Sequence, residues 1–154
     1  MASASVHEHR PRCGRWDAYT SWQSFLRARG TARTMAAFCQ ALLHYGKLNG
    51  CRFLSLRTLE LALQDVTGSR LVEKKGKPMH FAMGPRTRGT TPTSDEFGDT
   101  ASPRAFGHTG AGSSLCWADP ATGIHLAYIA NARSPERFHS ERLRAVNKAV
   151  QATI

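Results

Sequence analysis

The sequence lacks any long apolar run, and this absence argues against a membrane-spanning protein. No stretch of about 18 consecutive apolar residues occurs in the chain, so we expect no transmembrane helix. No apolar signal-peptide core stands near the first residues either. The four cysteines contain no C-x-x-C pair. Without a secretory signal, this pattern favours reduced, mostly buried thiols over a disulfide framework.

Acidic residues are scarce: 11 Asp and Glu stand against 21 Lys and Arg, which gives a formal net charge of +10. Such an excess favours anionic partners, nucleic acid included. The basic clusters are interrupted by Gly and Pro, lack interleaved aromatic residues and match no nucleic-acid-binding motif. We therefore interpret them as a solvated surface and expect neither nucleic-acid nor membrane association. A basic module that binds acidic partners is the alternative.

The first 33 residues are compatible with two cellular locations, the mitochondrion and the cytoplasm. Six arginines occur there against Glu8 and Asp17, and an arginine-rich start is typical of mitochondrial transit segments. The two acidic residues and the absence of a clear amphipathic stripe argue against that alternative. The expected location is the cytoplasm.

Two helices are expected in the first half of the chain. Residues 1–28 are expected to form an irregular lead that can be flexible, with a short amphipathic helix at 16–27 as the alternative, whereas Thr31 and Ser55 can each cap a helix. Gly46 ends the first helix. Its apolar face is predicted to carry Met35, Phe38, Leu42 and Tyr45.

Strands dominate the second half. Met79, Phe81 and Met83 alternate as one face of a half-buried strand. Residues 84–103, rich in Gly, Thr and Pro, are expected to be a functional loop or disordered. Strands are predicted at about 104–109, 113–118 and 124–131, and the stretch DPATG between the last two indicates a hairpin turn.

A helix closes the chain, with Ser134 as cap, Pro135 at the first helical position and a buried face of Leu143, Val146 and Val150. The predicted fold class is therefore α+β: preceding helices, an antiparallel β-meander and a C-terminal helix that covers it.

The stretch FGHTGAGSSLCWADPATGIHLAYIAN, residues 106–131, carries a family resemblance. Together with TARTMAAFCQALLHYGKLNGCRFLS it resembles the serine β-lactamase and penicillin-binding-protein superfamily, in its β-lactamase-related esterase branch. The resemblance covers residues 29–154 as the carboxy-terminal portion of such a domain and implies a partial β-lactamase or transpeptidase-like fold.

The resemblance also implies a site. The family's third box would be His108-Thr109-Gly110, with His108 and Thr109 contacting substrate and the backbone N–H of Ala111 donating to the oxyanion. An edge strand presents such donors at fixed positions, and Gly110 lets substrate approach the backbone. The implied chemistry is acyl transfer on ester, amide or lactam carbonyls, with no metal and no organic cofactor. From spacing alone, a bare sheet edge with an exposed His108 remains the alternative.

The catalytic motif of this family is absent from the sequence. The family needs Ser-x-x-Lys, yet no serine here is followed three residues later by lysine; Ser24 and Ser134 are followed by arginine. Arginine stays protonated and cannot withdraw the serine proton. We predict no catalytic residue within this sequence, and neither Ser113 nor Ser114 has a base placed nearby. The chain is expected to be a truncated form or a pseudoenzyme, completed by missing segments if it handles a small-molecule substrate.

Overall fold

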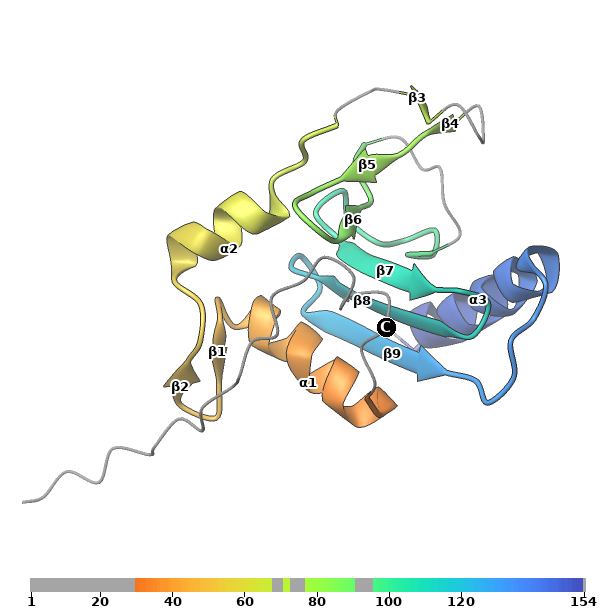
Figure 1. Cartoon of the computed structure of the whole chain (residues 1–154), viewed down its shortest axis with the longest axis horizontal. Helices are drawn as coiled ribbons and strands as arrows, with labels where there is room; N and C mark the ends of the chain where they lie inside the picture. The colour runs from red at the N-terminus through yellow and green to blue at the C-terminus, as the bar shows by residue number, and fades with distance from the viewer. Residues whose placement is uncertain (1–29, 68–70, 73–76, 91–95, 154) are drawn as a thin grey trace, which may run out of the picture.

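The computed structural model describes residues 30–67, 71–72, 77–90 and 96–153, which form three helices and three antiparallel sheets (Figure 1). The helices are α1 (Ala32–Leu43), α2 (Leu56–Leu63) and α3 (Glu136–Gln151). The strands are β1 (Lys47–Leu48), β2 (Cys51–Arg52), β3 (Leu71–Val72), β4 (Lys77–Pro78), β5 (His80–Phe81), β6 (Arg86–Thr87), β7 (Phe106–Gly110), β8 (Ser114–Asp119) and β9 (Ile124–Ile129). None of the described helices is long and apolar enough to cross a membrane. The predicted lead, residues 1–28, lies outside the described residues.

The largest sheet has five antiparallel strands in the order β5-β6-β7-β8-β9. The strands predicted at 104–109, 113–118 and 124–131 are confirmed as β7, β8 and β9, with ends shifted by at most two residues. Gly123 has a φ of +73° in the turn between β8 and β9, as the DPATG stretch predicts. The predicted α+β class with an antiparallel meander is confirmed.

Helix α3 lies behind the meander and covers one face of it (Figure 1). Leu143 packs there against Trp117 of β8, so the predicted covering by the C-terminal helix is confirmed. The rest of the predicted buried face is displaced, because Asn147 is fully buried while Val146 and Val150 are half-buried. Asn147 tolerates this position because its Oδ1 accepts a hydrogen bond from Trp117 Nε1 at 2.9 Å.

Helix α1 covers the other face of the sheet, so that β8 is buried on both sides. This second core cluster contains Cys39, Phe106, Cys116 and Ala118. Cys39 and Cys116 form a disulfide between α1 and β8, and the expectation of reduced thiols is wrong for this pair. The predicted apolar face of α1 is also partly wrong: Phe38 is 48% exposed and packs on Phe53, and Tyr45 lies beyond the helix with 64% exposure.

Capping residues fix where the helices begin. Thr31 caps α1, where it forms a capping box with Thr34, and the Ser55 side chain caps α2. Both residues are the predicted caps. At α3 the prediction is off by one position. Pro135 is the cap residue, and Ser134 instead donates its backbone N–H to Gly112 O at 2.9 Å.

The segment 79–83 forms a shorter strand than predicted, and its buried face is the opposite one. Only His80 and Phe81 are in β5, and the buried residues are His80 and Ala82, whereas Met83 is 62% exposed. His80 tolerates burial because its Nδ1 lies 2.6 Å from Asp65 Oδ2.

Residues 84–103 include more structure than a loop. They contribute β6, and Phe97 and Ala101 belong to the core beneath α3. The expectation of a stretch without secondary structure is therefore wrong for its described residues.

Candidate functional site

The two halves of β7 have different neighbours, and this difference creates the candidate site. Phe106 and Gly107 pair with β6 on one side and β8 on the other. His108, Thr109 and Gly110 pair with β8, and no described strand pairs with them on the other side. The His-Thr-Gly box therefore lies at the end of β7, the central strand of the largest sheet. One side of the strand is unpaired there among the described residues, and we call this side the open edge.

Within this box, the backbone groups of Thr109 point to the open edge. Ala105 O accepts a hydrogen bond from Arg88 N at 2.8 Å, which directs that carbonyl toward the β6 side. Backbone groups of every second residue in an antiparallel strand point to the same side, so those of Thr109 point to the open edge. His108 Nδ1 donates to Thr109 O at 2.6 Å. The exposed Ala111 follows directly, and its N–H has no hydrogen-bond acceptor among the described residues.

The side chains of His108 and Thr109 leave β7 on opposite faces, because side chains alternate along a strand. His108 shares the α1 face with Phe106. Thr109 lies on the α3 face, where its Oγ1 donates to Glu96 Oε1 at 3.1 Å. The structure thus brings together the backbone of the box, but not these two side chains.

Sequence reasoning missed a buried ion pair behind Thr109. The Arg86 guanidinium pairs with the Glu96 carboxylate, and both residues are buried. Glu96 Oε2 is buried without a hydrogen-bond partner among the described atoms, so its position depends on Arg86 and Thr109. A carboxylate immediately before the core residue Phe97, in a segment with few apolar residues, was the available signal.

The turn after β7 is held from outside the sheet. Arg133 Nε donates to Ala111 O at 3.0 Å, and Arg142 Nη2 donates to Gly112 O at 3.0 Å. Gly112 has a φ of +76°, and a Cβ at this position would clash with Ser134 O. A glycine is therefore required here. Ser113 O also accepts from Ala130 N at 2.7 Å, so the turn has a defined shape.

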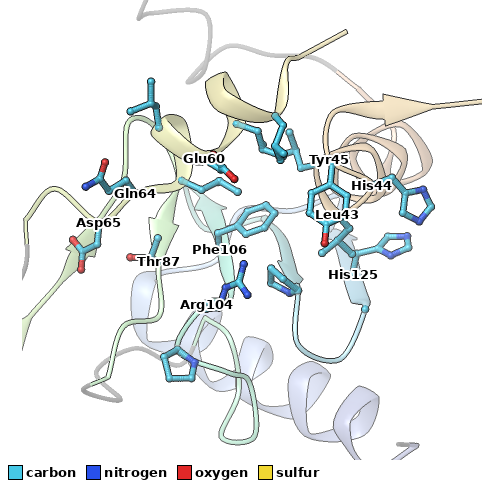
Figure 2. A pocket seen from close by; sticks show the side chains of 18 of the residues that line it. Leu43, His44, Tyr45, Glu60, Gln64, Asp65, Thr87, Arg104, Phe106 and His125 are labelled. Atoms are coloured by element: carbon cyan, nitrogen blue, oxygen red, sulfur yellow. The ribbon is translucent and has the colours of Figure 1, made fainter. Parts of the chain in front are cut away.

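A separate groove of about 1140 Å³ lies between α1, α2 and the start of β7. Figure 2 shows Phe106 at its centre, with Leu43 and His125 on one side and Glu60 on the other. None of residues 108–111 lines it. No cluster of three potential metal ligands occurs in the described part of the chain.

Comparison with known proteins identifies the family. The Beta-lactamase family model matches residues 2–151. This chain belongs to the beta-lactamase family. No curated protein sequence matches it.

Solved structures share its fold. A penicillin-binding protein homologue from Caulobacter crescentus is 26% identical with a TM-score of 0.57, over 75% of this chain and 30% of that one. A beta-lactamase from Mycobacterium bovis is 22% identical with a TM-score of 0.58, over 75% of this chain and 41% of that one. A family VIII carboxylesterase is 22% identical with a TM-score of 0.56, again over 75% and 30%.

The beta-lactamase family chain described here thus spans less than half the length of these structures. Its fold corresponds to a part of theirs.

Proposed function

We propose that this beta-lactamase family chain supplies the substrate-binding edge and the oxyanion donor of an acyl-serine hydrolase unit. The open edge at His108–Gly110, followed by the anchored turn with the exposed Ala111 N–H, carries the proposal. Preorganised backbone N–H groups stabilise the negative charge that develops on a carbonyl oxygen during acyl transfer. The substrate class is an ester, amide or lactam carbonyl compound.

In this proposal the 154 residues do not form an acyl-enzyme by themselves. Acyl transfer in this family needs a serine nucleophile and a lysine one helical turn away. The sequence contains no Ser-x-x-Lys, and the protonated arginines at the matching positions cannot act as a base. The nucleophile and base come from another segment or another chain. Without them, the chain is a non-catalytic member of the family.

The first experiment measures turnover of a p-nitrophenyl ester and of a chromogenic cephalosporin by the purified chain. We expect rates equal to the buffer background. Ser113→Ala serves as the matched control, because Ser113 is the serine nearest in the sequence to the proposed oxyanion donor. Turnover that disappears in Ser113→Ala would overturn the assignment of the nucleophile to a site outside this sequence.

The second experiment tests the oxyanion donor directly. An aryl phosphonate, whose tetrahedral anion mimics the intermediate, is titrated at millimolar concentration while amide NMR signals are followed. Signals of Thr109 and Ala111 are expected to shift. Ala111→Pro, which removes one N–H donor, should abolish the shift at Thr109, whereas His125→Ala in the separate groove should leave it unchanged. Shifts confined to the groove would refute the proposed site.

A further inference from the structure

The turn at residues 111–113 has a second layer behind it that contains a buried histidine. Arg142 of α3 reaches the turn with Nη2, which lies 3.0 Å from Gly112 O and 3.1 Å from His139 Nδ1. His139 is only 5% exposed. The guanidinium carbon of Arg142 also lies 5.7 Å from the ring centre of Tyr128 in β9. One guanidinium therefore links α3, β9 and the turn.

The contact between Arg142 and His139 requires a neutral imidazole. A guanidinium only donates hydrogen bonds, so His139 Nδ1 must be the acceptor, and the ring proton resides on Nε2. Proton uptake at Nδ1 would remove this acceptor and place two positive charges about 3 Å apart. The Arg142 side chain would then lose one of the two contacts that fix Nη2.

We propose that Arg142 is the positioning residue of the 111–113 turn, and that His139 holds it in place only while the imidazole is neutral. Acidification then loosens the turn. The inference rests on the proposed function for the role of the turn, because the loosened segment includes the Ala111 N–H. This contact of Arg142 with His139 and the turn, called the clamp below, can be measured without any substrate. If the clamp is absent, the proposed function still stands.

The charges around His139 support a transition in mildly acidic solution. Burial, and next the positive charge of Arg142, lower the pKa of His139 from its ordinary value of about 6.5. Glu136 on the same helix and Glu96 from the segment between β6 and β7 oppose this shift, as does the Ser114 backbone. His139 Nε2 nonetheless makes no hydrogen bond of normal geometry with a described residue. The neutral ring therefore persists at pH 7, and proton uptake occurs below about 6.5.

The test follows the Ser113 amide, because its N–H shares a peptide group with the Gly112 carbonyl that Arg142 binds. NMR spectra of the full chain are recorded from pH 7.5 to 5.0, together with the His139 ring signals. We expect the Ser113 signal to move with the same midpoint as the His139 ring. The exchange rate of the Ser134 amide, whose N–H donates to Gly112 O at 2.9 Å, should rise roughly tenfold once it is corrected for intrinsic chemistry, as loss of a hydrogen bond from a charged group allows.

Three variants separate a clamp from general loosening. His139→Gln keeps an acceptor that does not titrate and should abolish the Ser113 transition. Arg142→Lys keeps the positive charge and should retain part of the contact. Arg137→Met, on the exposed side of α3, removes an equal charge and should leave the Ser113 transition unchanged. A Ser113 transition that persists in His139→Gln, or whose midpoint differs from that of the His139 ring, would overturn the proposal. Because His139→Gln tests the idea without Arg142 substitution, misfolding of an Arg142 variant does not remove the test.

Discussion

Asp119 at the end of β8 connects the meander to the segment before β7, and its removal should weaken the whole domain. The carboxylate is 1% exposed. It accepts three hydrogen bonds: from Ser102 N at 2.8 Å, from Ser102 Oγ at 2.5 Å and from Ala121 N at 3.0 Å. Two of these donors are backbone N–H groups, which donate to no other acceptor among the described residues. The side chain thus fixes both the β8–β9 turn and the loop that leads into β7.

The size of the effect follows from these contacts. Hydrogen bonds to a charged group contribute about 1.5–3 kcal/mol each, and their losses are not additive. Water can reach part of the site in Asp119→Ala, so we expect a loss of about 3 kcal/mol. Asp119→Asn keeps one acceptor oxygen but turns an NH₂ group toward the Ser102 N–H or Ala121 N–H, and should lose about half as much. With an m-value of about 2 kcal/mol/M in urea, the alanine variant should unfold at a midpoint about 1.5 M lower.

Asp99→Ala is the matched control, since Asp99 is exposed and its side chain makes no hydrogen bond among those found in the described residues. It should unfold at the wild-type midpoint. The reasoning is refuted if Asp119→Ala loses less than about 1 kcal/mol, or if Asp119→Asn is the more damaging change.

Four further changes test other parts of the fold. Gly107→Ala places a methyl group against Cys116 O and should lower the melting temperature by about 4–8 °C; an unchanged melting curve would contradict the close approach. Asn147→Leu leaves the Trp117 indole N–H and Glu96 O unpaired, so urea unfolding should show a loss of about 2–4 kcal/mol. Because the pKa of His139 is lowered in the folded chain, the unfolded chain binds more protons below about pH 6.5, and stability should fall there in wild type more than in His139→Gln. Peptide mapping without reductant should recover Cys39 linked to Cys116, and two separate free peptides would contradict the pairing.

Much of the fold was predictable because its signals are local. Thr31 and Ser55 stand where helices begin, and the Asp-Pro turn separates two alternating apolar stretches that become β8 and β9. Each of these signals depends on neighbours within a few residues, so the sequence alone contains it. The position of the His-Thr-Gly box at a strand end was likewise predictable, through the family resemblance.

Pairings between distant residues were not predictable. Glu96 O accepts from Asn147 Nδ2 across 51 positions, and nothing near either residue indicates the other. The buried face of β5 was assigned wrongly for a similar reason. Met79, Phe81 and Met83 are more apolar than the alternate residues, but His80 has Asp65 as a partner, 15 positions away, which makes its burial possible.

The layout of β7 separates residues that hold the fold from residues with the proposed binding role. Its first residues pair with strands on both sides, and Gly107 lies so close to Trp117 that a side chain cannot be accommodated. Its last residues keep one open edge, and the turn beyond them is anchored through carbonyls by Arg133 and Arg142 rather than by another strand. A change in these arginines should therefore alter the geometry of the Ala111 N–H with little effect on the core, whereas a change at Gly107 should destabilise the sheet first. The same strand can thus lose its proposed binding role without losing its fold.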